Sequence, residues 1–200
     1  MGHLHIAETA RVFCGLHEVL FLPAAVPPHK DSKVVAGFND RANMIQLALA
    51  DNPAFRLSTI EASLPLPSYT VDTLRYFQTH AAIATEFFFI IGADAFLDIT
   101  SWKLYRQVLG AAHFVVVDRA GCASSEVHDL IARLGYEPEE PSQTQTWYHP
   151  ASLKKIFSPA FSSVDISSSR IRQNVKNNRA IDGLVPPAVL EYIQTHGLYV

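Results

Sequence analysis

The fold class is decided by one stretch, Glu86-Phe87-Phe88-Phe89-Ile90-Ile91-Gly92-Ala93-Asp94. Its aromatic and β-branched run is typical of a strand that is buried on both faces of a sheet. A glycine and an aspartate follow directly, where such a strand would end. We therefore predict a central strand of an α/β protein, with polar residues at its carboxyl end.

Helix and strand patterns alternate on both sides of this stretch. We predict strands at 18–22, 56–64, 113–117 and 155–157, and helices at 4–14, 40–51, 70–79, 94–109 (broken), 127–134, 169–177 and 187–195. Residues 136–149 are the most loop-like segment. Strands separated by helices imply right-handed crossovers, hence a doubly wound, mostly parallel sheet flanked by helices, which binds ligands at the carboxyl ends of its strands.

Composition indicates one globular domain over residues 1–200, with a small helical portion at about 166–200. Of the 200 residues, 48% are apolar, and 16 Lys and Arg against 19 Asp and Glu give a net charge of −3. This balance excludes disordered chains, disulfide scaffolds and nucleic-acid binders with a broad basic face. Any site for an anion must be small and local.

Cysteine usage and hydropathy favour the cytoplasm. Cys14 and Cys122 are far apart and neither belongs to a CxxC pair, so we expect neither a metal knuckle nor a redox pair. The apolar runs are shorter than the ~20 residues that a spanning helix needs, and no secretory signal is visible, so we expect no membrane partner.

Two segments carry groups suited to phosphate. In Pro27-Pro28-His29-Lys30, prolines fix the backbone beside an imidazole and an ammonium group. In Ile166-Ser167-Ser168-Ser169-Arg170-Ile171-Arg172, hydroxyls and free amides at a helix start form an anion site, which Arg172 could close. The alternatives are a rigid turn with solvated side chains and a serine-capped surface helix.

Three further features are candidates for contacts with a nucleotide. Gly92 would let a flat ligand approach the backbone, and Asp94 could accept hydrogen bonds from a sugar or base, or cap the next helix. Trp102 could stack on an aromatic ring, or lie in the core or at its rim. His3 would stand among the free amides at the start of a helix, unless that end is frayed.

The combination and order of these motifs resemble the nicotinate mononucleotide adenylyltransferase family of the nucleotidyltransferase superfamily. The resemblance covers nearly the whole chain. It is carried by Gly2-His3, Pro27-Pro28-His29-Lys30, Arg41 with Met44, Ser68-Tyr69-Thr70-Val71-Asp72-Thr73-Leu74, Phe89-Ile90-Ile91-Gly92-Ala93-Asp94, Trp102, Asp118-Arg119-Ala120-Gly121, Ile166 to Arg172, and Val185-Pro186 to Tyr199.

The resemblance implies a Rossmann-like fold and adenylyl transfer from ATP to nicotinate mononucleotide, which yields nicotinate adenine dinucleotide and diphosphate in NAD biosynthesis. It implies Mg²⁺ bound through the substrate phosphates, with no metal-ligating side chains. No covalent enzyme intermediate is expected, so catalysis would consist of positioning and charge stabilisation.

The resemblance also implies a role for each site residue. His3 would be catalytic, stabilising charge on the α-phosphate beside Gly2, while Gly92, Asp94 and Arg119 would contact the ATP nucleoside. Thr70 and Trp102 would hold the nicotinate ring. The remaining phosphate contacts would come from His29, Lys30, Ser168, Ser169 and Arg172.

Four departures from the family pattern affect these expectations. Ser169 replaces a threonine, Lys103 replaces an aromatic residue after Trp102, and Ala120 replaces the proline of an RPG turn. The family begins with a strand that leads into a GGTFDPxHxGH element, whereas this sequence starts at Met1-Gly2-His3. We therefore expect the first strand and one site histidine to be missing, and this polypeptide to have weak or no activity.

Two alternatives to the main hypothesis remain. The acceptor could be nicotinamide mononucleotide or another phosphate monoester, because the contacts that select it are largely made by the backbone. The chain could also be a truncated nucleotide-binding remnant without activity. The sequence does not indicate an oligomeric state.

Overall fold

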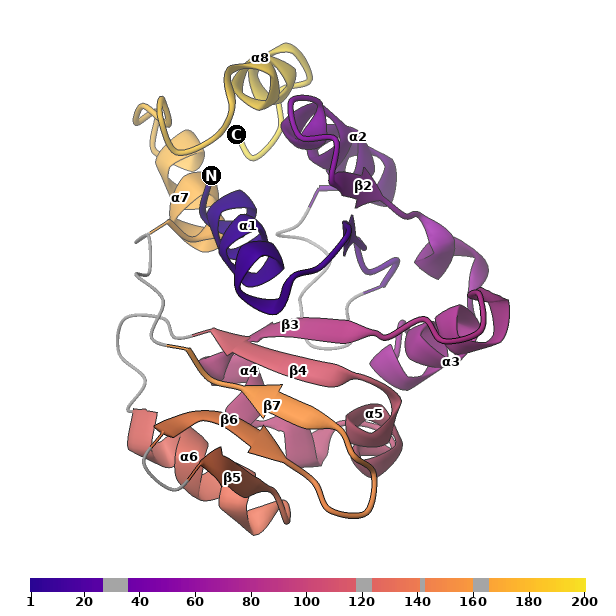
Figure 1. The fold of residues 1–200 in the computed structure, drawn as a ribbon. Coiled ribbons are helices and arrows are strands. Elements are labelled where there is room, and N and C mark those ends of the chain that lie inside the picture. The colour runs from indigo at the N-terminus through magenta and orange to yellow at the C-terminus, as the bar shows by residue number, and fades with distance from the viewer. Residues whose placement is uncertain (27–35, 118–123, 141–142, 160–165) are drawn as a thin grey trace. The chain divides into compact units, whose positions relative to one another are not determined.

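The structure is a computed structural model that describes residues 1–26, 36–117, 124–140, 143–159 and 166–200. Its contacts divide the chain into two compact units. We call Met1–Ser68 with Val164–Val200 the terminal unit and Tyr69–Ser163 the central unit. Figure 1 shows the helices and strands of each. That residues 1–200 form one domain stays a prediction.

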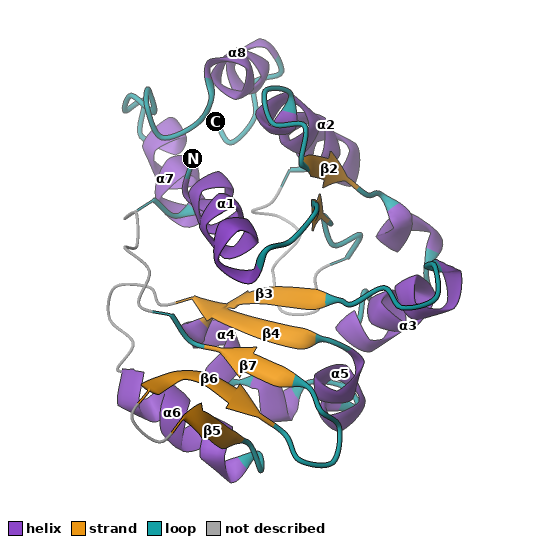
Figure 2. Ribbon diagram, viewed as in Figure 1, coloured by secondary structure: helices purple, strands orange, loops and turns teal. Residues whose placement is uncertain are grey.

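The central unit is built on a five-stranded sheet of order β3-β4-β7-β6-β5. Its strands are β3 (Phe88–Gly92), β4 (His113–Val117), β5 (Glu137–Glu140), β6 (Gln143–Tyr148) and β7 (Lys155–Phe157). β3 and β7 pair with β4 in parallel, whereas β6 pairs antiparallel with β7 and β5. The predicted α/β class is confirmed (Figure 2), but β3 lies at an edge of this sheet, and the strand buried along its whole length is β4.

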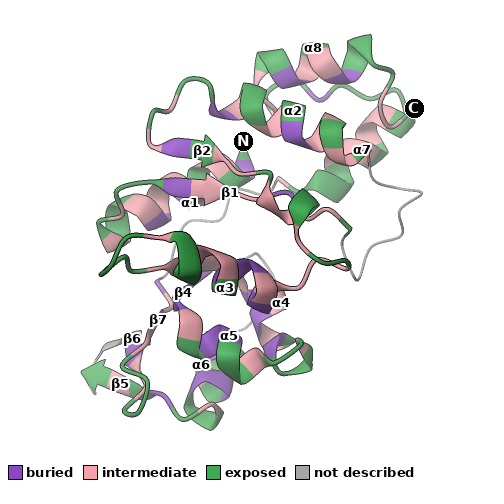
Figure 3. Ribbon diagram, turned by 90° about the vertical axis from the view of Figure 1, so that its right-hand side faces the viewer, coloured by how far each residue is buried: buried purple, intermediate pink, exposed green. Residues whose placement is uncertain are grey.

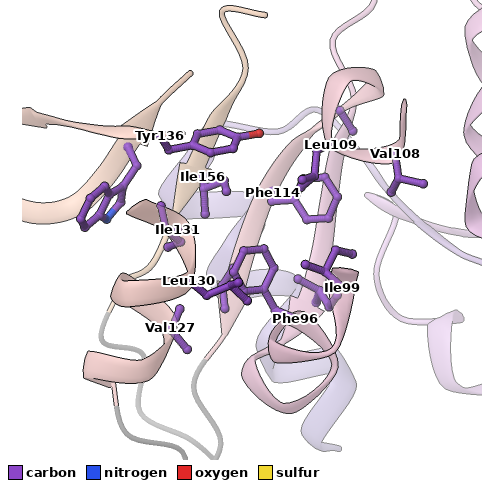
Figure 4. Packing of buried hydrophobic residues seen from close by; sticks show 14 of the residues in the cluster. Phe96, Ile99, Val108, Leu109, Phe114, Val127, Leu130, Ile131, Tyr136 and Ile156 are labelled. Atoms are coloured by element: carbon purple, nitrogen blue, oxygen red, sulfur yellow. The ribbon is translucent and has the colours of Figure 1, made fainter. Parts of the chain in front are cut away.

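The helices of the central unit share one apolar core with the sheet. They are α3 (Thr70–His80), α4 (Ala93–Leu97), the 3-10 helix η3 (Ile99–Ser101), α5 (Tyr105–Ala111) and α6 (Ser124–Arg133). Phe96, Ile99, Phe114, Ile131 and Ile156 are fully buried where these elements meet (Figure 4). The broken helix predicted at 94–109 is thus confirmed as α4, η3 and α5.

The segment predicted to be loop-like, 136–149, is instead largely a β-hairpin. β5 is mostly exposed and lies at the sheet edge, held by pairing with β6 and by the Tyr148 hydroxyl, which donates to Glu137 (3.0 Å). Trp147 anchors β6 because its ring is buried in the core. The prediction was wrong because the polar residues of β5 show no alternation that would mark a strand.

The terminal unit contains α1 (Gly2–Cys14), β1 (Val19–Phe21), α2 (Phe38–Leu49), β2 (Phe55–Leu57), the 3-10 helix η2 (Ile60–Ser63), α7 (Ser168–Lys176) and α8 (Pro187–Thr195). β1 and β2 pair in parallel, so three of the five described strand pairings in the chain are parallel. The strand predicted at 56–64 is shorter than expected, because the chain turns into η2 after β2.

Small apolar faces hold the terminal unit together. Ile181, Val189 and Ile193 are buried at α8 and the segment before it, and Met44 of α2 packs against them. Gly15 ends α1 in the left-handed conformation (φ 64°), as its position predicted. Figure 3 shows the burial along the chain, which in α1 falls on Gly2, Ala7 and Ala10 and in α8 on Val189 and Ile193. Along the described residues, no helix combines the length and apolarity that a membrane crossing requires.

Candidate active site

In the terminal unit, the starts of α1 and α7 lie side by side. A Cβ built on Gly2 would stand 3.0 Å from the carbonyl oxygen of Ile166, two residues before α7. Figure 1 shows the N-terminus beside α7. His3 is exposed in the first turn of α1, and Ser168 is the first residue of α7. The structure thus brings the predicted catalytic histidine and the predicted phosphate-binding serines to one region.

The start of α7 has the form of an anion site. The Ser167 hydroxyl caps the helix by accepting from the Arg170 amide (3.2 Å), and no acidic residue occupies the first turn. The first amides of a helix have no intrahelical acceptor, and they carry the positive end of its dipole. Ser168 and Ser169 present exposed hydroxyls at this end. The helix predicted at these serines is confirmed, with Ser167 as its cap; that its start binds an anion stays a prediction.

Arg172 folds back over this turn, where its guanidinium donates to the Ser169 hydroxyl (3.2 Å). Serine in place of threonine therefore keeps the hydroxyl that Arg172 uses. Nearby, burial raises the pKa of the Tyr199 phenol, while the positive charges of Arg172 and Arg41 oppose that rise. Two arginines from different helices thus act on one phenol in the terminal unit.

Arg41, whose role the sequence could not assign, makes two contacts with distant backbone. Its Nε donates to the Ala36 carbonyl (3.1 Å) and its Nη2 to the Ala25 carbonyl (3.3 Å). Burial lowers the pKa of this guanidinium. Arg41 therefore contacts the backbone on both sides of residues 27–35, the stretch that includes His29 and Lys30.

Ser68 supports one of these ends. Its hydroxyl accepts from the backbone amides of Ala25 (3.1 Å) and Val26 (3.4 Å). The residues that the segment carries, His29 and Lys30, lie outside the described part of the chain. Sequence reasoning included Arg41 and Ser68 in the family pattern but gave neither a contact, because their partners are main-chain atoms.

In the central unit, Gly92 and Asp94 lie at the carboxyl end of β3, as predicted. Gly92 pairs with Val117, the last residue of β4, and precedes α4. Its backbone is extended (φ −70°, ψ 147°), so its conformation does not require glycine. Asp94 is exposed in the first turn of α4, whereas the neighbouring Ala93 is buried. Arg119, two residues beyond β4, lies outside the described residues.

Thr70 and Trp102 are brought to one place on the central unit. Thr70 begins α3, and Trp102 follows η3 directly. The next residue, Lys103, reaches the first turn of α3, because its Nζ lies 3.1 Å from Asp72 Oδ2 and 4.3 Å from the centre of the Tyr69 ring. Trp102 itself is half-buried, edge-on to Phe89 (6.1 Å), so it lies at the rim of the core.

The hollows found among the described residues lie elsewhere. One, of about 230 Å³, lies between the end of α7 and α8, and another, of about 290 Å³, is lined by Tyr105, Tyr136 and His149. None of the predicted site residues lines either hollow. Within the described ranges, no group of three His, Cys, Asp or Glu side chains is placed to hold a metal ion.

Comparison with known proteins identifies the family. A probable nicotinate-nucleotide adenylyltransferase of Desulfotalea psychrophila is 36% identical over 200 residues, which cover 99% of this chain and 92% of the relative. One of Pelobacter propionicus is 39% identical over 206 residues, covering 100% of this chain and 92% of the relative. The chain belongs to the nicotinate-nucleotide adenylyltransferase family.

Two further comparisons agree with this assignment. Residues 1–174 match the cytidylyltransferase-like family. The Plasmodium falciparum nicotinic acid mononucleotide adenylyltransferase, solved with NaAD, shares the fold with a TM-score of 0.72 at 17% identity, covering 99% of this chain and 90% of that one. The resemblance that the motifs indicated and the Rossmann-like fold are therefore both confirmed.

Proposed function

We propose that this protein transfers the adenylyl group of ATP to the 5′-phosphate of nicotinate mononucleotide, as a step of NAD biosynthesis. The observation that carries the proposal is the similarity to nicotinate-nucleotide adenylyltransferases, at 36–39% identity over nearly the whole chain. The start of α7 supports it, because phosphate groups, such as those of ATP, are among the anions that a helix N-terminus binds.

The reaction needs little chemistry from the protein. A phosphate oxygen of the mononucleotide attacks the α-phosphorus of ATP and forms a new P–O bond. The bond from that phosphorus to the bridging oxygen breaks, and diphosphate leaves with the electron pair. Because no enzyme group is modified, the protein contributes alignment of the reactants and stabilisation of the charge that develops on the phosphates.

The phosphates of ATP would lie at the joined starts of α1 and α7. His3 would donate to the α-phosphate, and Ser168, Ser169 and Arg172 would hold the β- and γ-phosphates. His29 and Lys30 would add positive charge, and Arg41 contacts the backbone on both sides of their segment. This arrangement explains how a chain of net charge −3 could hold a polyanion, since the positive groups are gathered locally.

The two nucleosides would be held by the central unit. Gly92 and Asp94 would contact the ATP nucleoside, and Arg119 would lie near the adenine. Trp102 would stack on the nicotinate ring, and Thr70 would contact it through its backbone. The position of Trp102 at the rim of the core, with one edge against Phe89, supports a stacking role for the part of its ring that stays exposed.

Magnesium would enter with ATP, bound to its phosphates, and would neutralise charge on them. The described residues provide hydroxyl, amide, imidazole and guanidinium groups at the proposed phosphate site. These groups suit the phosphate oxygens themselves. We propose the cytoplasm as the compartment and small molecules, without nucleic acid or membrane, as the partners.

The test measures diphosphate release by the full chain with ATP and each of two acceptors, nicotinate mononucleotide and nicotinamide mononucleotide. Release with the nicotinate form, even at the low rate that the family pattern led us to expect, with nicotinate adenine dinucleotide as the second product, would support the proposal. Faster reaction with the nicotinamide form would reassign the acceptor. No reaction with either acceptor, from a protein that is folded by circular dichroism, would contradict the proposed function.

A further inference from the structure

Lys103 departs from the aromatic residue common in the family, and its surroundings fix where its charge lies. Its Nζ lies 3.1 Å from Asp72 Oδ2 and 4.3 Å from the centre of the Tyr69 ring. An ammonium group over an aromatic face is attracted by the ring quadrupole. Two contacts on separate groups therefore hold this flexible side chain against the first turn of α3.

Asp72 does not neutralise Lys103 alone, because it is shared with a second cation. Arg75 Nη1 lies 3.1 Å from the other carboxylate oxygen, Asp72 Oδ1. The cluster of Asp72, Arg75 and Lys103 thus carries one excess positive charge. The Asp72 side chain is also the most buried of the three, at 19% exposed against 44% for Lys103 and 57% for Arg75. The carboxylate is thus the least accessible of the three charged groups.

This excess charge lies beside the residues proposed to hold the mononucleotide ring. Lys103 follows Trp102 directly, and the two residues it contacts stand on either side of Thr70 in the chain. The start of α3 adds the positive end of a helix dipole, since Thr70 is the first residue of this 11-residue helix. The local field is therefore positive from two independent sources.

We propose that Lys103 is a specificity-determining residue, which favours a mononucleotide whose ring carries a carboxylate over one that carries a neutral carboxamide. This inference rests on the proposed function. Nicotinate and nicotinamide mononucleotide differ by one negative charge at the ring substituent, so a fixed positive charge nearby discriminates between them. A neutral aromatic residue at position 103 would leave this discrimination to backbone groups.

The test compares Lys103→Gln, which removes the charge, with Lys103→Arg, which keeps it. For each, kcat/KM is measured with both mononucleotides at saturating ATP. We expect Lys103→Gln to lower the ratio of nicotinate to nicotinamide activity roughly 3- to 10-fold, in line with the modest strength of partly exposed charge contacts. Lys103→Arg should keep the ratio within about twofold of the wild type.

Lys155→Gln is the matched control. Lys155 also pairs with a carboxylate, Glu139 (2.6 Å), and is similarly exposed at 36%, but it lies on β7. We expect no change in its ratio. Added salt should lower the wild-type ratio and have little effect on that of Lys103→Gln, because salt screens a charge contact. If Lys103 only held the first turn of α3 in place, added salt would not change the wild-type activity ratio more than that of Lys103→Gln.

Equal loss of activity toward both acceptors in Lys103→Gln, or an unchanged ratio, would overturn the inference while leaving the proposed function standing. Equilibrium binding of each mononucleotide to wild type and Lys103→Gln is measured by calorimetry in parallel. If the wild type catalyses neither reaction, the proposed function fails, and the ratio of the two dissociation constants still decides whether Lys103 discriminates. An unchanged binding ratio in that case would overturn the inference as well.

Discussion

Gly2 and Ile166 approach each other so closely that a methyl group on Gly2 would press against the Ile166 carbonyl oxygen. A Cβ on Gly2 would lie 3.0 Å from the Ile166 carbonyl oxygen. Because these residues stand at the starts of α1 and α7, their approach sets the distance between two helix N-termini. A side chain at position 2 would therefore press against the start of α7, where the proposed phosphate donors lie.

Gly2→Ala should therefore weaken both the fold of the terminal unit and the use of ATP. The added methyl group forces the Ile166 carbonyl to move by a few tenths of an ångström, and overpacking of this kind costs about 1–2 kcal/mol of unfolding free energy. We expect the KM for ATP to rise more than the KM for the mononucleotide. Denaturant melts and initial rates measure the two effects.

Gly110→Ala provides the control for this change. Gly110 lies inside α5, and a Cβ there would meet no atom within 4 Å. Alanine is the better helix former, so this variant should gain about 0.5–1 kcal/mol of stability. A loss of stability in both variants would indicate that the contact with Ile166 is not the cause.

Arg172→Ala and Trp102→Ala should separate the two substrates. Arg172 donates to Ser169 at the start of α7, so its loss should raise the KM for ATP about 10-fold or more, as expected for a charge-assisted contact to phosphate. Trp102→Ala should instead mainly raise the KM for the mononucleotide, because a stacking surface is lost. Steady-state kinetics with each substrate varied in turn will measure the two KM values. Arg179→Ala is the control, because Arg179 is an exposed arginine beyond α7. Equal effects of both variants on both substrates would contradict the assignment.

Arg41→Lys should lower activity although it keeps the charge. The planar guanidinium reaches the Ala25 and Ala36 carbonyls at once, whereas a single ammonium group cannot reproduce this fork. Losing one such contact should cost about 1–3 kcal/mol of stability and raise the KM for ATP, because the backbone on one side of residues 27–35 is released. Arg56→Lys is the control: Arg56 is 69% exposed and pairs with Glu18 on the surface. If Arg41→Lys matched Arg56→Lys in melting and kinetics, Arg41 would not be a positioning residue.

The fold was predictable wherever burial left a pattern in the sequence. The helix at 187–195 and the strand at 113–117 were predicted with the same bounds that the structure shows. The helix has apolar residues at helical spacing, and the strand is a short continuous apolar run. β5 could not be predicted, since its exposed, acidic residues are held in a strand by their partner rather than by their own burial.

The candidate site divides in the same way. The start of α7 could be predicted from the sequence, because serine is a residue type that caps a helix with its own side chain, as Ser167 does. The contacts of Arg41 and Lys103 could not be predicted, because they join residues up to 34 positions apart in the chain, and their partners are backbone carbonyls, a carboxylate and an aromatic face. A lysine in place of an aromatic residue was seen as a departure, and only the structure shows what it contacts.

Stability should also depend on pH through His113, which is buried on β4. Its Nδ1 accepts from the Lys155 amide (3.0 Å), so the ring is neutral in the folded state. Burial, helped by Lys154 and Lys155 and opposed by Glu86, lowers the pKa of this imidazole below the usual 6.5. The unfolded chain then binds more protons than the folded one just below pH 6.5, so the stability that the neutral ring contributes is present above that pH and declines as pH falls toward the folded-state pKa. The slope from one group is at most about 1.4 kcal/mol per pH unit.

His113→Asn tests this dependence, because asparagine keeps an acceptor for the Lys155 amide but does not titrate. The unfolding free energy of this variant should fall less than that of the wild type over this pH window. His80→Asn, at an exposed position on α3, is the control and should follow the wild type. Urea melts at several pH values measure this difference, and an unchanged slope in His113→Asn would show that protonation of this histidine does not weaken the fold.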